Sequence, residues 1–505
     1  MSQGAGGRDA AEVPSASLAA ATNGQVAGGI AAGRVIGNSA VYTLGNVLPQ
    51  GMNMLLLTVF TRYLSPAEFG IFSYTVGICA FLALFGHLSI HSYVLRHYFE
   101  CRTEEARRRL FGSIFGFLVV YDALLLATEL LLMPRLFRAL GAQVPFEPYM
   151  RLALLNTAIE ILAVVPMTYF RVREQAAHFV ALSLTQTILN GALSFYLVVV
   201  AGAGILGRYY GLLGANAVLV GACLLVMARV AAWSWDWAAI RSAVVFSAPL
   251  SVAGLLWLVQ TMSDRLILER FVTLSQLGVY SVGFSIAYGI NSLSNGIYKA
   301  IEPQVYRLAD GALLDRKIVE MKRYMVLLLA ALGCVLITFS REILVILAGP
   351  SFYESYKIVA LLAVSVVLQG VSVPASTYAI AIDRTRYVPF VHLAGAGASL
   401  AANLVLVPLL GIYGAAAGSI TASIVTLYAY TALTERGSAV RWQIGPDFLW
   451  MAGSFGLSAA ILQVDTHWLP TSLALKGLLL AGVIASLAWR GTRKGNVLVA
   501  RSSLA

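Results

Sequence analysis

Long apolar segments recur along almost the whole chain, and each is long enough to cross a lipid bilayer as a helix. A spanning helix needs ~20 mostly apolar residues, and it satisfies its backbone hydrogen bonds internally where no water is present. The sequence therefore predicts an all-α polytopic membrane protein. Fourteen spanning helices are predicted, at about 36–60, 69–92, 110–133, 150–170, 178–201, 209–229, 243–263, 278–298, 323–348, 357–380, 388–409, 411–433, 447–464 and 470–489.

The composition excludes a soluble protein of this length. Hydrophobic residues make up 59% of the chain and charged residues 12%, and the mean hydropathy is +0.79. Soluble domains carry roughly 45–50% apolar and about 25% charged residues. Only residues 1–33 lack a long apolar run, and we expect them to form a disordered cytoplasmic tail. The four cysteines are isolated from one another, which argues against a zinc site or a disulfide framework.

The distribution of basic residues predicts an orientation. If the N-terminus is cytoplasmic, 25 of the 35 Lys and Arg residues fall on the cytoplasmic side. Cytoplasmic loops of membrane proteins carry such an excess. The longest of these loops, 93–109 and 299–322, are also the most basic. The net charge of +11 is therefore interpreted as a sign of topology, with both termini in the cytoplasm, and nucleic-acid binding is not expected.

Two stretches of the chain resemble each other at a spacing of 208 residues. Residues 62–74 read RYLSPAEFGIFSY, and residues 270–282 read RFVTLSQLGVYSV. Spacings of 209 and 200 residues align further pairs in later helices, Thr168-Tyr169 with Thr377-Tyr378 and GLLGA at 211–215 with GIYGA at 411–415. The first spacing aligns Arg62 with Arg270, Gly70 with Gly278 and Ser73 with Ser281.

The repeat predicts two lobes of six helices, residues 34–230 and 241–435. Two further helices, 446–489, and a cytoplasmic tail, 490–505, lie outside it. Because six is even, both lobes start on the same side, so the repeat is parallel. Two parallel lobes are typical of an alternating-access transporter with a cavity between them. The chain has no GxxxxGK[ST] motif, so an ion gradient, the membrane potential or the cargo's own gradient must supply the energy.

Several stretches resemble the polysaccharide-biosynthesis flippases of the MOP superfamily, relatives of the lipid II flippase and of the MATE antiporters. They are TRYLSPAEFGIFSY (61–74), FSAPLSVAGLL…SDRLILERFVTLSQLGVYS (246–281), GPSFYESYKIVALLAV (349–364) and VPLLGIYGAAAGSI (407–420). The resemblance covers roughly residues 34–435. It implies a flippase, not an enzyme, that moves an undecaprenyl-pyrophosphate-linked oligosaccharide across the bacterial inner membrane for cell-surface polysaccharide biosynthesis.

The resemblance also implies the partners. They are a lipid-linked glycan, membrane lipids, a proton or sodium ion and proteins of polysaccharide assembly, around a monomer without a cofactor. The alternative function is a MATE-like cation-coupled antiporter of small organic molecules. A membrane glycosyltransferase or polymerase is a third possibility, but the longest outer loop is short and no loop pairs carboxylates at catalytic spacing.

Polar residues form stripes on the helices that the resemblance places around the cavity. Because polar side chains are costly in hydrocarbon, these stripes are expected to face the interior. They predict a partly cationic vestibule that receives the pyrophosphate and sugars, with hydrogen bonding between helices as the alternative. The stripes consist of Asn46, Gln50 and Asn53 on the first helix, His87 and His91 on the second, and Tyr288, Asn291, Asn295 and Lys299 on the eighth.

Charged residues give four more candidates. Arg96 follows the second helix and is expected as a positive-inside residue, with a phosphate contact as the alternative. Arg265 ends the seventh helix, where a role in gating or substrate contact competes with a local ion pair. Asp122 and Glu160 are acids near mid-membrane in the first lobe, and they are candidates for ion coupling. Their alternative is a structural hydrogen bond, for example to Asn190.

Overall fold

Every regular element that the structure describes is a helix. Ten helical segments of the described chain are long and apolar enough to cross a membrane. Four further helical segments correspond to the remaining predicted helices, namely residues 48–63, α10, α16 and α17. Each of the fourteen predicted segments thus has a counterpart in the structure. The predicted fold class is therefore confirmed. The computed structural model describes residues 48–306, 311–435, 440–442, 444–464 and 469–502.

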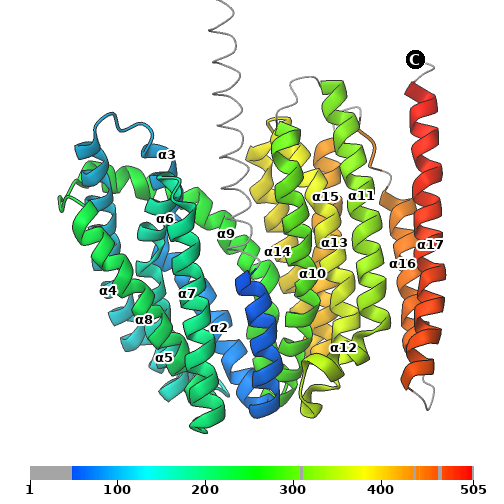
Figure 1. Ribbon diagram of the computed structural model, residues 1–505, viewed down its shortest axis with the longest axis horizontal. Coiled ribbons are helices and arrows are strands. Elements are labelled where there is room, and N and C mark those ends of the chain that lie inside the picture. The colour runs from blue at the N-terminus through cyan, green and yellow to red at the C-terminus, as the bar shows by residue number, and fades with distance from the viewer. Residues whose placement is uncertain (1–47, 307–310, 436–439, 443, 465–468, 503–505) are drawn as a thin grey trace, which may run out of the picture.

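The helices form two lobes side by side, with a helix pair beside the second (Figure 1). The N-lobe comprises residues 48–63, α2 (Pro66–His87), α3 (Ile90–His97), α4 (Glu104–Leu140), α5 (Arg151–Leu162), α6 (Val164–Val172), α7 (Ala176–Phe195) and α8 (Gly204–Val230). The C-lobe comprises α10 (Leu274–Tyr306), α11 (Gly311–Thr338), α12 (Ser340–Leu347), α13 (Ser355–Ala381), α14 (Val388–Leu410) and α15 (Ile412–Glu435). The appended pair is α16 (Ile444–Leu462) and α17 (Leu469–Ser502).

Helix α9 (Trp237–Phe271) is shared by the two lobes. It begins at Asp236, whose carboxylate accepts hydrogen bonds from the backbone N–H groups of Ala238 and Ala239 at 3.0 and 3.1 Å. Its first part packs on the N-lobe, where Ala243 joins the buried core. After Pro249 it packs along α14 of the C-lobe. The crossing of α9 is also visible in Figure 1.

The aligned residues of the repeat meet each other where the lobes touch. Helices α2 and α10 pack together, and the hydroxyl of Ser281 donates a hydrogen bond to that of Ser73 at 2.7 Å. A Cβ on Gly70 would lie 2.0 Å from the carbonyl oxygen of Leu274, and one on Gly278 would lie 1.8 Å from that of Pro66. Residues that the repeat aligns, such as Ser73 and Ser281, are therefore in contact with each other. Only glycine at positions 70 and 278 allows the backbones of α2 and α10 to come this close.

A second pair of repeat-related contacts flanks this one. The guanidinium of Arg62 donates to the carbonyl of Ile346 in the opposite lobe at 3.3 Å, and that of Arg270 donates to the carbonyl of Leu140. The backbone N–H of Gly349 donates to the hydroxyl of Thr61 at 3.2 Å. All these contacts lie at one end of the molecule, which we call the far end.

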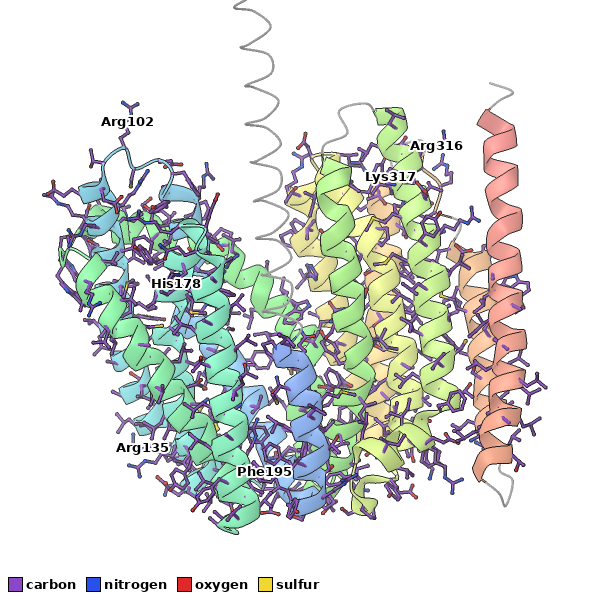
Figure 2. All side chains as sticks on the ribbon, viewed as in Figure 1. Arg102, Arg135, His178, Phe195, Arg316 and Lys317 are labelled. Carbon is purple, nitrogen blue, oxygen red and sulfur yellow. The ribbon has the colours of Figure 1, made fainter. Side chains whose placement is uncertain are left out.

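The opposite end, called the basic end, carries Arg102 in the loop between α3 and α4 and Arg316 and Lys317 in the first turns of α11 (Figure 2). The buried core of the N-lobe toward the basic end is separate from that of the C-lobe, whereas toward the far end one continuous core includes both. In Figure 1 the ribbons of the lobes also diverge toward the basic end. The lobes are therefore joined mainly at the far end and through α9.

The predicted second helix is interrupted in the structure. Leu88 and Ser89 have φ values of 47° and 53°, a left-handed conformation that ends α2 and starts α3. The Nδ1 atom of His87 accepts a hydrogen bond from the Ser89 N–H at 3.0 Å, which satisfies one amide that the break leaves open. Hydropathy alone gives no sign of the break, because the apolar run continues through it.

Two ion pairs fix the appended helices to the C-lobe. Toward the basic end, Lys322 of α11 pairs with Asp447 of α16 at 2.5 Å. Toward the far end, Lys476 of α17 pairs with Glu342 of α12 at 2.6 Å, and its side chain is only 1% exposed. Both helices also pack on α11. The pair is therefore anchored to the C-lobe at both ends.

We predict that Lys476→Ala destabilises the protein on the order of 3 kcal/mol, because it leaves the Glu342 carboxylate nearly buried and unpaired. The measurement is the thermal unfolding midpoint in detergent. The double variant Lys476→Ala/Glu342→Ala should recover much of the loss. Lys357→Ala, which breaks an exposed pair with Glu354, is the matched control and should cost less than about 1 kcal/mol. Equal losses for the two lysines would contradict the prediction.

Candidate functional site

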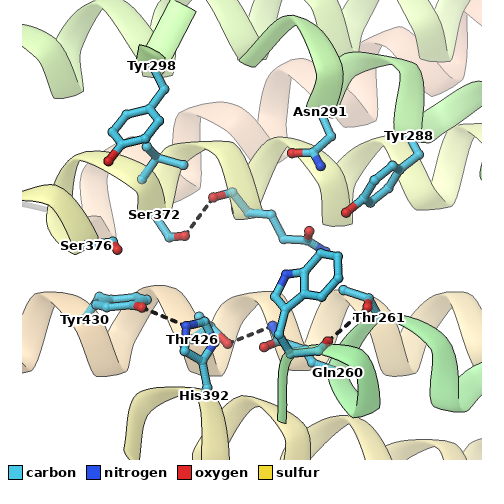
Figure 3. Close-up of a pocket in the computed structure, with 13 residues that line it drawn as sticks. Gln260, Thr261, Tyr288, Asn291, Tyr298, Ser372, Ser376, His392, Thr426 and Tyr430 are labelled. Atoms are coloured by element: carbon cyan, nitrogen blue, oxygen red, sulfur yellow. Dashed lines mark hydrogen bonds between the residues drawn. The ribbon is translucent and has the colours of Figure 1, made fainter. Parts of the chain in front are cut away.

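A polar cavity of about 280 Å³ lies within the C-lobe. It is enclosed by α9, α10, α13, α14 and α15, and α9 and α10 are the two of these that also contact α2 of the N-lobe. Figure 3 shows side chains from these helices converging on it. The lining residues are Trp257, Gln260, Thr261, Tyr288, Asn291, Tyr298, Gln369, Ser372, Val373, Ser376, His392, Thr426 and Tyr430.

Hydrogen bonds between helices hold part of this lining in place. The amide of Gln260 donates to the Thr426 hydroxyl at 3.0 Å, and the Tyr430 hydroxyl lies 3.1 Å from Nε2 of His392. Among the described residues, two polar atoms of the same side chains, Oε1 of Gln260 and Nδ1 of His392, are buried without a hydrogen-bond partner. A buried polar atom without a partner costs ~1–3 kcal/mol.

A glycine allows the Gln260 side chain to reach α14. A Cβ on Gly395 would lie 2.8 Å from Oε1 of Gln260 and 2.3 Å from the Thr426 hydroxyl oxygen. Farther toward the far end, the hydroxyl of Ser399 donates to the backbone carbonyl of Gln260 at 3.3 Å. Helix α9 is thus fixed to α14 along the cavity wall.

The structure brings together only part of the predicted vestibule. Tyr288 and Asn291 line the cavity. Gln50 and Asn53 are exposed, and neither lines it. Asn46 lies outside the described residues, as do the side chains of Asn295 and Lys299.

The second-helix candidates lie elsewhere, around the break between α2 and α3. The rings of His87 and His91 are 6.0 Å apart in an edge-on arrangement. Arg96 is exposed at the basic end, where its guanidinium lies 3.8 Å from the Glu100 carboxylate and 5.5 Å from the ring of Phe246 on α9. Arg96 is thus accessible beside the helix that crosses between the lobes.

Arg265 is buried in α9, and its contacts include a local ion pair. Its guanidinium lies 3.6 Å from the Asp264 carboxylate and 4.0 Å from the ring centre of Phe284. The ring of Phe284 stacks on that of Tyr288 at 5.0 Å, which links Arg265 to the cavity wall. Asp264 also accepts a hydrogen bond from the hydroxyl of Tyr280.

The two candidate acids differ in their surroundings. Asp122 on α4 is 4% exposed, and no residue in the described part of the chain forms a hydrogen bond or ion pair with its carboxylate. It faces the last turn of α2, because its Oδ1 lies 3.6 Å from the position of a Cβ on Gly86. Glu160 is exposed.

The suggested partner of these acids is engaged elsewhere. The Oδ1 atom of Asn190 accepts a hydrogen bond from the guanidinium of Arg208 at 2.7 Å. Among the described residues, no hydrogen bond joins Asn190 to Asp122. The guanidinium of Arg208 also lies 4.8 and 5.3 Å from the ring centres of Phe60 and Phe72.

Sequence reasoning missed most of the cavity lining. A signal was present, because Gln369, Ser372 and Ser376 recur at helical spacing within an apolar helix. Thr426 and Tyr430 repeat the pattern on α15. Such small polar residues also serve as ordinary contacts between membrane helices, so the pattern alone does not identify a cavity.

Comparison with known proteins identifies a family and solved structures that this chain resembles. Residues 59–357, which are 299 of the 505, match the family model described as polysaccharide biosynthesis protein. No curated protein matches the chain. A solved structure described as the lipid II flippase MurJ in an inward closed conformation superposes with a TM-score of 0.67 at 15% identity, covering 90% of this chain and 99% of that chain.

Two MATE transporters give a similar result. An inward-facing multidrug resistance MATE transporter of the MOP superfamily has a TM-score of 0.63 at 14% identity, covering 78% of this chain and 100% of its own. The Vibrio cholerae MATE transporter VcmN in its bent form has a TM-score of 0.53 at 17% identity, covering 80% and 97%. These likenesses show a common fold. The family match over more than half of the sequence shows that the chain belongs to the polysaccharide biosynthesis protein family.

Proposed function

We propose that the chain is a flippase that moves an undecaprenyl-pyrophosphate-linked oligosaccharide across the bacterial inner membrane by alternating access. The observation that carries the proposal is the closure of the far end by contacts between repeat-related residues, Ser73 with Ser281 above all. By the positive-inside rule the basic end is the cytoplasmic side, so both termini are cytoplasmic and the lobes diverge toward the cytoplasm. This arrangement suits loading of a cargo that is assembled inside the cell.

The contacts at the far end are suited to opening. The hydrogen bond of Ser281 to the opposite lobe is worth ~0.5–1.5 kcal/mol, and those of the charged Arg62 and Arg270 are worth ~1.5–3 kcal/mol each. The repeat relates Arg62 to Arg270 and Ser281 to Ser73. A movement that separates the two lobes at the far end therefore breaks these hydrogen bonds together. Helix α9 keeps the lobes connected at the basic end.

The polar chemistry favours a glycan over a small organic cation. The described lining of the C-lobe cavity contains no Asp or Glu, and a cation site would need such a carboxylate. Arg96 is the exposed cation beside α9 that would meet the pyrophosphate. The matched family is described as polysaccharide biosynthesis proteins, and a structure of the same fold is described as a lipid II flippase.

We predict that a disulfide between the lobes stops transport. Ser73→Cys/Ser281→Cys places two thiols where the hydroxyl oxygens are 2.7 Å apart, so oxidation should join α2 to α10. The background replaces the four native cysteines with alanine. Flipping of the native lipid-linked glycan in proteoliposomes should fall more than tenfold on oxidation and return on reduction.

The control is a disulfide within one lobe. Ser365→Cys/Ser423→Cys joins α13 to α15, where the hydroxyl oxygens are 2.9 Å apart, and it should leave flipping intact. Mass spectrometry verifies each cross-link. Full transport by the cross-linked Ser73→Cys/Ser281→Cys protein would contradict opening at this contact.

We further propose that Asp122 couples flipping to a proton or sodium gradient, with Glu160 as the second candidate. A buried carboxylate without a protein partner is stabilised by binding a proton or cation. Asp122 also faces the end of α2, the helix that closes the far end. Ion binding there would act on the helix that has to move.

Asp122→Asn should therefore weaken the dependence of flipping on pH or sodium, because an amide neither binds nor releases a proton in this range. The measurement is the flipping rate in proteoliposomes from pH 5.5 to 8.5, with and without sodium. Glu105→Gln, which changes an exposed carboxylate on the same helix, should keep the wild-type profile. An unchanged profile in Asp122→Asn would remove Asp122 from the coupling mechanism.

A further inference from the structure

Among the side chains that the structure describes, the lining of the C-lobe cavity is polar but carries no Lys, Arg, Asp or Glu. Its thirteen residues comprise four aromatic rings, three amides, four Ser or Thr hydroxyls, one imidazole and one valine. The amides and hydroxyls both donate and accept hydrogen bonds. This set matches a ligand that is itself uncharged, rich in donors and acceptors, and partly apolar on its faces.

Four of the polar residues that α9 and α10 contribute to the lining have no polar counterparts in the N-lobe. At the spacing of 208 residues, Gln260, Tyr288, Asn291 and Tyr298 align with Met52, Ala80, Ala83 and Ile90 of the N-lobe. Since those four are apolar, general packing of this fold does not require polar side chains at these positions. These four polar side chains on α9 and α10 are therefore specific to the C-lobe.

We propose that this cavity is a subsite for one uncharged sugar residue of the cargo, an inference that rests on the proposed flippase function. Sugar hydroxyls both donate and accept hydrogen bonds, as the amides and hydroxyls of the lining do. The C–H faces of a pyranose ring pack against aromatic rings, which Trp257, Tyr288 and Tyr430 provide.

The size and position of the cavity agree with one sugar and not with the whole headgroup. Its volume of about 280 Å³ lies at the lower edge of the ~300–1,000 Å³ range of small-molecule pockets. A pyrophosphate would need cations, and Arg96 is held outside the cavity at the basic end. Trp257, which is 44% exposed, lies where the cavity meets the surface of α9. A glycan can thus insert one ring while its lipid and phosphates stay outside.

The test compares two cargoes in proteoliposomes, the lipid-linked glycan extracted from the native cells and undecaprenyl pyrophosphate without sugar. Gln260→Leu and Asn291→Leu remove hydrogen-bonding groups from the cavity with little change in side-chain volume. Each should raise the half-saturating concentration of the glycan lipid at least tenfold and leave that of the sugar-free lipid unchanged. Gln186→Leu, which removes an amide bonded to Asn216 in the N-lobe, is the matched control and should not separate the two cargoes.

A second measurement separates the subsite from the flippase function. The glycan released from its lipid by mild acid should raise the thermal unfolding midpoint of the wild type and leave that of Gln260→Leu unchanged. If the released glycan stabilises the wild type but no lipid is flipped, the subsite stands and the proposed function fails. If the wild type flips the glycan lipid but the variants lose both cargoes equally, or neither, the subsite is overturned.

Discussion

The approach of two helix backbones at Gly70 and Gly278 determines how the rest of the molecule is arranged. Any side chain at either position would overlap a carbonyl of the opposite lobe, so the lobes meet here through main chain and not through bulky side chains. The small residues Ser73 and Ser281 extend the contact. Close packing of this kind gives attraction without a hydrophobic driving force, which lipid does not provide between membrane helices. Such a contact can hold a closed state and still release it.

The two lobes share a fold but divide the polar chemistry. The N-lobe contains charged groups. The Asp122 carboxylate is buried on α4 without a partner among the described residues, and the Arg208 guanidinium packs against two aromatic rings. The C-lobe holds a neutral cavity built from amides and hydroxyls. The repeat of the fold alone does not require the two lobes to carry different polar groups. The division suits a carrier that responds to an ion in one lobe and recognises its cargo in the other.

Hydropathy and self-similarity predicted the architecture well, because both depend on properties that one segment carries by itself. The alignment identified Gly70 and Gly278 as equivalent residues but did not predict that they meet. Their contact in the structure has a simple reason, because a two-fold axis brings equivalent residues together at its centre. The cavity was harder to predict. Tyr288 and Asn291 were identified from their stripe on one helix, whereas His392 and Thr426 join them only through the packing of five helices. The break at Leu88 and Ser89 depends on backbone conformation, which apolar runs do not encode.

The anchoring of α16 and α17 has a mechanical consequence. Because ion pairs clamp Lys322 to Asp447 and Lys476 to Glu342, the appended pair and the C-lobe form one body in the bilayer. Any rearrangement between the lobes therefore carries the appended helices along with the C-lobe. Leu449 and Leu457 of α16 and Leu478 of α17 are exposed, so part of the apolar surface that this body presents to lipid belongs to the appended pair.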